Sequence, residues 1–337
     1  MPPTDDASTG EHPATPLVSV ITPTYRRTAM LRQALDSAVA QEFRDFEVIV
    51  SDNDCDPEVE RIVAGYGDAR LRYRHNGRNV GALENALVAF REARGRYVTM
   101  LHDDDAWEPG YLARTVPVLE ADPTLSLAFC DHHVMGPDGR VDEVATERST
   151  EMWRRSDMRP GVHRPFVTEA LVDRSVPIAM ASVIRRDAVD WDDFPPEIGT
   201  IYDIWLAYLA CRDGAGAHYV PERLTRYREH GGAITSTTRY DRQFVYCYDR
   251  FATDPRLAEH RPVLRREAAV FRCGLGLSVL AEGGPRGEAR QLLWSSLVLK
   301  PSARALAGLP LTVLPRGSLD AVRTLLRRLP RRVAVRA

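Results

Sequence analysis

The first hundred residues alternate between short apolar runs rich in β-branched residues and segments whose apolar residues recur at helical spacing. The predicted strands cover 17–22, 46–51, 71–74 and 97–101, and the predicted helices lie around 30–38, 59–63 and 80–90. This alternation predicts an α/β fold of Rossmann-like organisation, with a mainly parallel sheet covered by helices. Ligands bind such sheets at the carboxyl ends of the strands, so the residues that follow each strand are the first candidates for a functional site.

Polar and charged residues follow three of the four predicted strands. The segments are Pro23-Thr24-Tyr25-Arg26 after the first strand, Asp52-Asn53-Asp54 after the second, and His102-Asp103-Asp104-Asp105 after the fourth. Because these strands are predicted to be parallel, their carboxyl ends meet at one edge of the sheet. The sequence therefore predicts that three separate segments line one crevice.

The acidic triplet Asp103, Asp104 and Asp105 requires an explanation of its own. Three adjacent carboxylates repel one another and destabilise a fold unless a cation lies between them. A divalent ion that prefers oxygen ligands, Mn²⁺ or Mg²⁺, meets this requirement. A run of aspartates can also be a solvated turn that caps the next helix. Its position after an apolar strand, beside the two other polar segments, favours the metal site.

The chain after the acidic triplet is organised less regularly. We predict a strand at 125–130, a hairpin-like turn at 136–139, long loops at 143–165, a strand at 178–184, a helix at 202–211 and further helices from 241 onward. These patterns divide the chain into a disordered lead-in (1–16), an α/β domain (17–232) and a helical C-terminal extension (233–337).

Three segments, in matching order and spacing, resemble glycosyltransferase family two. They are Val18–Tyr25, Asp45–Asn53, and Gly95–Asp105 followed by Pro109. The resemblance covers roughly residues 17 to 232. It implies the GT-A fold, a nucleoside-diphosphate sugar as donor, transfer with inversion, and a metal ion, Mn²⁺ or Mg²⁺, that bridges the diphosphate.

The resemblance also implies roles for single residues. Contacts with the nucleotide sugar are expected from Pro23, Thr24, Tyr25, Arg26, Asp52 and Asp103. Within this set Asp52 would bond the base, since a base imide N–H needs an acceptor, and Asp103 would lie near the ribose. Asp104 matches the metal-binding aspartate, and Asp105 would support it. His102 stands where many members have the first aspartate of an Asp-x-Asp motif, so the signature is shifted or shortened here.

Two later segments are further candidates. Asn79 precedes the third predicted helix and either approaches the nucleotide or caps that helix. Tyr227-Arg228-Glu229-His230 resembles a late Tyr-Arg-x-His element of the family. There His230 would reach the metal or the diphosphate, and Arg228 would screen phosphate charge. A single late histidine can also be structural.

The general base is where the sequence departs from the family. An inverting displacement needs a carboxylate that accepts the proton of the acceptor hydroxyl. Many members place an acidic residue at the start of the helix expected from Tyr202, and here that position is Thr200, which cannot act as a base. Asp203 is the first candidate and Glu197 the second, although Asp203 can also be an ordinary carboxylate at a helix start.

Composition narrows the alternatives. The chain has 45 basic and 47 acidic side chains and a net charge of −2, which gives no electrostatic footprint for nucleic acid. Lys300 is the one lysine in the sequence, which counts against enzymes with a catalytic lysine, metal-dependent phosphohydrolases among them. Five cysteines without a Cys-x-x-Cys pair indicate neither a disulfide framework nor a zinc site, and fit a reducing cytoplasm.

The C-terminal end is basic. Residues 301–337 contain eight arginines against one acid, Asp320, and the leucines of 319–329 fall on one helical face. A basic amphipathic helix can lie at an anionic membrane surface, here the inner face of the membrane. It can also pack on the protein or remain in solvent. No apolar run reaches the ~18 residues needed to span a membrane.

Taken together, these features predict a cytoplasmic, metal-assisted inverting glycosyltransferase with a nucleoside-diphosphate sugar donor. The acceptor is expected to be a hydroxyl of a glycan, a lipid-linked molecule or a small molecule. Two alternatives stay open: a catalytically silent module that binds nucleotide sugars, which the residue Thr200 keeps open, and a metal-dependent phosphohydrolase.

Overall fold

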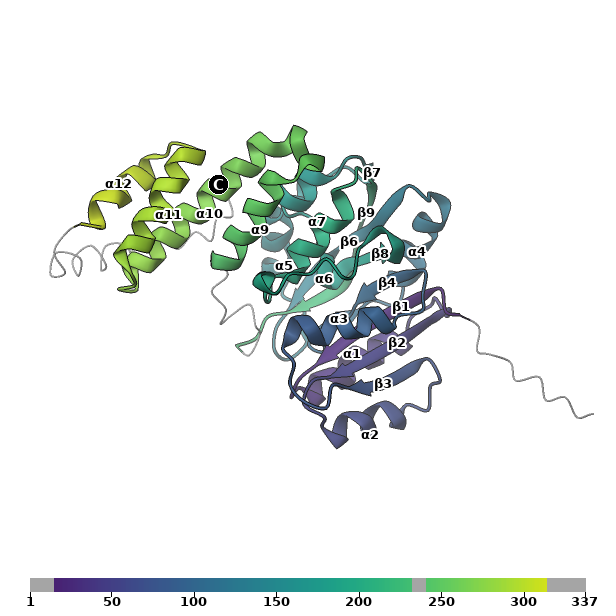
Figure 1. The fold of residues 1–337 in the computed structure, drawn as a ribbon. Coiled ribbons are helices and arrows are strands. Elements are labelled where there is room, and N and C mark those ends of the chain that lie inside the picture. Colours follow the sequence, from purple (N-terminus) through teal and green to yellow (C-terminus); the bar gives the residue numbers. More distant parts are fainter. Residues whose placement is uncertain (1–14, 232–240, 314–337) are drawn as a thin grey trace, which may run out of the picture.

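The computed structural model describes residues 15–231 and 241–313 (Figure 1). Its centre is a nine-stranded sheet in the order β3-β2-β1-β4-β8-β6-β9-β5, with β7 also paired to β9. The strands are β1 (Val18–Thr24), β2 (Phe46–Asp52), β3 (Leu71–His75), β4 (Tyr97–Met100), β5 (Ala106–Trp107), β6 (Leu125–Met135), β7 (Gly161–His163), β8 (Ser182–Arg185) and β9 (Gly216–Arg228).

Helices cover both faces of this sheet and continue beyond it. They are α1 (Thr28–Val39), α2 (Pro57–Gly65), α3 (Ala82–Glu92), α4 (Tyr111–Ala121), α5 (Glu143–Met152), α6 (Ile178–Ala181), α7 (Tyr202–Cys211), α9 (Asp241–Thr253), α10 (Arg261–Ala281), α11 (Arg286–Leu299) and α12 (Ala303–Leu311). Short helical turns include η1 (Arg155–Asp157), η2 (Thr168–Val172), η4 (Pro196–Ile198) and η5 (Pro255–His260).

The sheet is mixed but mostly parallel. β1 pairs in parallel with β2 and β4, β2 with β3, and β6 with β9, whereas β8 is antiparallel to both β4 and β6. The predicted α/β fold with alternating strands and helices is therefore confirmed. Strands β1, β2 and β4 were predictable because each is a buried run on both faces, as parallel strands under helices require.

Alternate side chains of each strand feed two cores. Val20 and Val48 point to one face, where they pack with α1, α2 and α4. Ile21 and Met100 point to the other face, where they pack with α3, α7 and the first helices of the C-terminal extension. Tyr248 of α9 belongs to this second core, so the packing is continuous across the proposed domain boundary at 232. A separate apolar cluster begins at Cys273 and holds α10, α11 and α12 together.

Two predictions for the segments 143–165 and 178–184 were wrong. The segment 143–165 was expected to be loops, but it contains α5, η1 and β7. The spacing of apolar residues did not indicate α5 because the helix buries two threonines, Thr146 and Thr150, in place of an apolar stripe. The segment 178–184 was expected to be one strand, but it is the short helix α6 followed by β8.

The long strand β9 was not predicted at all. Its pairing with β6 shifts register near Asp131, and these irregularities break the alternation of buried and exposed residues. Tyr227 and Arg228, expected in a polar turn, are the last residues of this strand. By contrast, the predicted turn at 136–139 is present, closed by the antiparallel bridge between Met135 and Val141.

No helix within residues 15–231 and 241–313 is long and apolar enough to cross a membrane. The predicted amphipathic helix at 319–329 lies outside the described residues, as do residues 1–14 of the predicted lead-in. All five cysteines are free thiols, and four of them are buried.

Candidate active site

The carboxyl ends of β1, β2 and β4 bring together the three segments that the sequence singled out. Thr24 at the end of β1 faces Asp52 at the end of β2 in the parallel register. The Thr24 hydroxyl donates a hydrogen bond of 2.8 Å to Oδ2 of Asp103, and the Asn53 N–H donates to the Thr24 carbonyl at 3.0 Å. The predicted convergence of the three segments is therefore confirmed.

Arg27 holds two members of the acidic triplet from the start of α1. Its guanidinium Nη1 lies 3.0 Å from Oδ1 of Asp103 and 2.7 Å from Oδ2 of Asp104. The neighbouring Arg26, predicted to contact the nucleotide, has a positive φ of 58°. Its exposed side chain forms an ion pair with Asp54. Arg27 thus pairs with two of the three carboxylates of the triplet, and the contact of Arg26 with a nucleotide stays a prediction.

Arg228 supports the triplet from the end of β9. Its backbone N–H donates to Oδ1 of Asp105 at 2.9 Å, and its Nε donates to the Asp104 carbonyl at 2.7 Å. The rest of the guanidinium bonds Gln33 and the carbonyls of Gly136 and Pro137. The Arg228 side chain is buried, and these contacts fix the loop that carries the aspartates.

Three side chains of the site have ligand atoms close enough to share one metal ion. His102, Asp104 and Asp105 each place one such atom within 4.8 Å of the others. Oδ2 of Asp105 is buried, accepts no hydrogen bond, and lies 3.6 Å from Nδ1 of His102. A buried carboxylate oxygen without a donor fits a cation ligand, and two carboxylates with an imidazole suit Mn²⁺.

The charges of the site confirm its demand for positive charge. Burial by itself would lower the pKa of His102, but the Tyr202 hydroxyl and the carboxylates of Asp105 and Asp104 raise this pKa well above its ordinary value. Burial raises the pKa of both Asp103 and Asp105. For Asp104 burial acts in the same direction, but His102, His230 and Arg27 outweigh it and lower the pKa.

His230, predicted as a metal ligand, lies against the triplet. Its Nε2 is 3.1 Å from Oδ2 of Asp104, and its side chain is almost buried. In this structure His230 therefore contacts Asp104, a proposed metal ligand. The sequence predicted His230 as a ligand and did not assign His102 to the metal.

The predicted nucleotide residues lie around the ends of β1 and β2. Both carboxylate oxygens of the buried Asp52 accept hydrogen bonds, from the N–H groups of Asp54 and Asp56 and from the Tyr73 hydroxyl. Its contact with a base stays a prediction, as do those of Pro23 and the half-exposed Tyr25. Asn79 accepts bonds from the Asn53 side chain and the Gly81 N–H. The alternative that Asn79 caps α3 was wrong, because that cap is Gly81.

The candidate bases lie at the start of α7 and just before it. The Tyr202 hydroxyl is 3.0 Å from Nε2 of His102, which places the first turn of α7 beside the triplet. Asp203 is the next residue, and its side chain is exposed to solvent. Protein atoms farther from the carboxyl still displace part of the surrounding water, and this desolvation raises its pKa. Glu197 is exposed on η4, and Thr200 bonds the side chain of Gln243.

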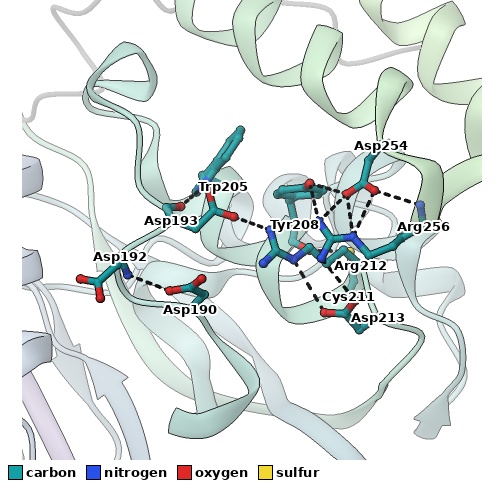
Figure 2. A network of polar contacts seen from close by, with 10 residues as sticks. All are labelled: Asp190, Asp192, Asp193, Trp205, Tyr208, Cys211, Arg212, Asp213, Asp254 and Arg256. Atoms are coloured by element: carbon teal, nitrogen blue, oxygen red, sulfur yellow. Dashed lines mark hydrogen bonds and ion pairs between the residues drawn. The ribbon is translucent and has the colours of Figure 1, made fainter.

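The other end of α7 is fixed by a polar network (Figure 2). The Tyr208 hydroxyl donates to Asp254, whose carboxylate also binds the Arg256 guanidinium at 2.9 Å. Arg212 forms an ion pair with Asp193, and the carbonyl of Asp193 accepts the Trp205 indole N–H at 2.6 Å. Helix α7 therefore has polar contacts at both ends, and these contacts position Asp203 relative to the triplet.

Comparison with known proteins agrees with this geometry. Residues 19–168 match the family model described as Glycosyl transferase family 2. An uncharacterized Mycobacterium tuberculosis H37Rv protein is 28% identical over 235 residues, which are 67% of this chain and 62% of that protein. The chain thus matches about three fifths of the length of such relatives. Escherichia coli WcaA, a putative colanic acid biosynthesis glycosyl transferase, is 35% identical over 29% of this chain and 36% of its own.

Solved structures extend the comparison to the fold. Staphylococcus aureus TarS 1–349 superposes with a TM-score of 0.64 at 17% identity, over 92% of this chain and 90% of TarS 1–349. The same protein in complex with UDP-GlcNAc superposes with a TM-score of 0.65 at 16% identity, with the same coverage of both chains. At this identity the match shows the fold alone, and it confirms the predicted GT-A architecture.

Three residues of the site were missed at the sequence level. They are Arg27, His102 as a candidate ligand, and Tyr202. A signal existed for His102, which directly precedes the aspartates, but none separated Arg27 from Arg26. That choice depends on the backbone turn after β1, which the residue types do not reveal.

A cavity of about 500 Å³ lies along β6 and β9. The cavity is lined by Asp131, His133, Thr150, Arg155, Met158, Tyr219 and Arg223, among others.

Proposed function

We propose that this protein transfers a glycosyl group from a nucleoside-diphosphate sugar to an acceptor hydroxyl, with inversion and with the help of a divalent cation. The observation that carries the proposal is the meeting of Thr24, Asp103 and the cluster of His102, Asp104 and Asp105 at one sheet edge. The match to the family model supports it, as do the name of the E. coli relative and the TarS complex with UDP-GlcNAc.

The metal site is the first part of the proposal. Asp104, Asp105 and His102 would hold Mn²⁺ or Mg²⁺, with His230 bonded to Asp104 behind it. When bound, the ion supplies positive charge that stabilises the diphosphate as a leaving group. Arg27 keeps the carboxylates in place through its contacts with Asp103 and Asp104, and Arg228 acts as a positioning residue.

The donor nucleotide would lie along the ends of β1 and β2. Pro23, Thr24, Tyr25 and Arg26 form the loop against it, and Tyr25 is exposed enough to contact a ring. Asp103 would bind the ribose, since a carboxylate suits a diol. Asp52 and Asn79 lie at the far end of this site. Asp52 accepts hydrogen bonds from the N–H groups of Asp54 and Asp56, and Asn79 accepts one from the Asn53 side chain.

Asp203 is the proposed general base, and Glu197 is the second candidate. As the acceptor oxygen attacks the anomeric carbon, Asp203 takes the hydroxyl proton and the bond from that carbon to the diphosphate breaks. The raised pKa of Asp203 makes it a better proton acceptor than an aspartate of ordinary pKa.

The cavity along β6 and β9 is the proposed acceptor site. Its buried charges are paired with one another: Asp131 binds Arg155 at 2.6 Å, and Arg223 binds Glu147 at 2.9 Å. The Asp131 carboxylate also accepts the Thr150 hydroxyl at 2.7 Å. A polar cavity without excess charge suits a neutral, hydroxyl-rich acceptor such as a saccharide better than an ionic one.

A donor screen tests the proposal. The thermal midpoint of the full chain would be measured with UDP-, GDP- and dTDP-linked sugars, with and without Mn²⁺. We expect stabilisation by one nucleotide class that requires the metal, followed by sugar transfer to a panel of neutral saccharides. No metal-dependent stabilisation by any donor would refute the proposal. Donor binding without turnover would instead support a silent nucleotide-sugar binding module.

A further inference from the structure

The last two described helices carry an unusual share of exposed apolar side chains. Eight large apolar residues of the described chain are exposed, and four of them lie between 294 and 313. Trp294 and Val298 on α11 are 62% and 65% exposed, and Leu306 on α12 and Val313 just after it are 57% and 66% exposed. We call these four residues the α11–α12 surface.

The two helices expose these residues while their other faces are buried. Trp294 and Val298 are four residues apart and share one stripe of α11, whereas Ala289 and Leu293 face the cluster with α10. Arg290, one turn before Trp294, donates from Nε to the Thr312 hydroxyl at 3.1 Å. This bond places the Trp294 stripe of α11 beside the end of α12, where Val313 lies.

The helices also stand away from the catalytic sheet. In Figure 1 α11 and α12 project beyond the sheet, next to α10 and far from β1 to β4. Their apolar cluster is separate from the core that contains the strands. Nothing within residues 15–231 and 241–313 covers Trp294, so the surface is available to something outside this part of the chain.

Charge indicates what binds there. Between 286 and 313 the basic residues are Arg286, Arg290, Lys300 and Arg304, and the one acid, Glu288, is paired with Arg242. Arg290, Lys300 and Arg304 are exposed. An apolar surface that contains an exposed tryptophan and is surrounded by basic residues has the chemistry that binds an anionic lipid interface.

The same charges disfavour other occupants. A second copy of the surface would bring two sets of basic residues together. Residues 314–337 contain seven arginines and one acid, Asp320, so this segment is also repelled. We propose that the α11–α12 surface binds anionic lipid bilayers, and that it places the enzyme at a membrane through residues outside its catalytic domain. The inference does not depend on the reaction proposed above.

Vesicle co-sedimentation of the full chain tests this inference. The probes are vesicles of phosphatidylcholine alone and vesicles with one third phosphatidylglycerol. We expect binding to the anionic vesicles that weakens as salt is raised, and about a tenfold loss of partitioning in Trp294→Ser/Val298→Ser. The matched control is Val144→Ser/Val162→Ser, which removes two exposed valines from the catalytic domain and is expected to bind like wild type.

A second pair of variants tests the contribution of charge. Lys300→Glu/Arg304→Glu is expected to lose binding to phosphatidylglycerol vesicles, while Arg61→Glu/Arg148→Glu, which alters exposed arginines of the catalytic domain, is expected to keep it. Unfolding midpoints show that each variant is folded, and donor binding by the Trp294 variant is expected to be unchanged.

Three results would overturn the inference. One is a wild-type chain that does not bind anionic vesicles, and another is a Trp294→Ser/Val298→Ser variant that binds as well as wild type. The third is a lipid-free dimer, detected by light scattering, that dissociates in the same variant, since the surface would then bind a second copy. A failed donor screen with retained vesicle binding would refute the proposed reaction and leave this inference in place.

Discussion

The hydroxyl of Tyr202 lies 3.0 Å from Nε2 of His102, and this contact joins the start of α7 to the acidic triplet. One side of the contact carries the proposed metal ligands, and the other carries the proposed base, Asp203. This hydrogen bond and the network around Tyr208 and Asp254 at the other end of α7 both contribute to the relative position of the proposed ligands and the proposed base.

Tyr202→Phe is expected to lower kcat about three- to tenfold, the effect of one lost hydrogen bond of about 1 kcal/mol. The ring stays in place, so the KM for the donor is expected to change less than kcat. Steady-state kinetics would show this, with Tyr66→Phe as the control because the Tyr66 hydroxyl bonds Asp36 on the exposed side of α1. Equal losses in the two variants would show that the Tyr202 contact has no special role.

Arg27 and Arg26 are adjacent and chemically identical, which makes them a matched pair. Arg27→Gln leaves Asp103 and Asp104 without their shared cation, and is expected to cost about 2 kcal/mol of unfolding free energy and most of the activity. Arg26→Gln removes only an exposed ion pair with Asp54 and is expected to change stability by less than about 0.5 kcal/mol.

Denaturant unfolding would compare the two variants. Addition of Mn²⁺ is expected to restore part of the stability lost in Arg27→Gln, because a bound cation also separates the carboxylates. Equal unfolding free energies for the two variants would contradict the structural assignment of Arg27.

Metal binding distinguishes His102 from His230. If His102 is a direct ligand, His102→Ala is expected to weaken Mn²⁺ binding at least about tenfold, while His230→Ala, which acts through Asp104, has a smaller effect. Electron paramagnetic resonance of free Mn²⁺ measures this without a donor. His260→Ala, on η5, is the control. A larger loss in His230→Ala would restore the ligand set suggested by the sequence.

The sequence was most informative where local pattern and function coincide. Strands β1, β2 and β4 are continuous apolar runs, and the residues at their carboxyl ends lie at one edge of any parallel sheet. The sequence therefore predicts that Thr24, Asp52 and Asp103 lie close together. The demand of three adjacent carboxylates for a cation is also a local property of the chain.

Other features depend on contacts that no local pattern contains. Hydroxyl groups attach helix α5 to the sheet. The buried Thr146 oxygen, for example, accepts a hydrogen bond from the Val134 N–H of β6. The turn at Arg26 sends its side chain outward and the next one inward. Arg228 was recognised as important, but its contacts with Gln33 and Pro137 arise only from the tertiary fold.

Asp203 gives the reaction a specific dependence on pH. A base must be ionised, and desolvation raises the pKa of this carboxyl above the ordinary value of 3.8, so kcat is expected to fall with decreasing pH before an ordinary aspartate would be protonated. Asp203→Asn is expected to lower kcat by about 10²- to 10⁴-fold without loss of donor binding. Glu197→Gln serves as the comparison in the same assays. Unchanged turnover in both variants would show that the base is another group.

Glu47 gives a pH dependence of stability at the opposite end of the sheet. This buried carboxylate accepts bonds from Ser19, Arg72 and Arg94, and although burial opposes ionisation, these partners lower its pKa to about 2 from 4.5. A lowered pKa in the folded state means that the stabilisation is present above pH 4.5 and is lost as the pH falls from there toward 2.

Glu47→Gln is therefore expected to lower the unfolding free energy by about 2 kcal/mol at pH 7, a value reduced for the partial exposure of Arg72 and Arg94. The difference from wild type is expected to shrink below pH 4.5, where unfolded Glu47 takes up a proton. Urea unfolding at a series of pH values measures both effects, with Glu58→Gln, an exposed partner of Arg32, as control. A difference between wild type and Glu47→Gln that stayed constant down to pH 3 would show that the ion pairs around Glu47 do not stabilise the fold.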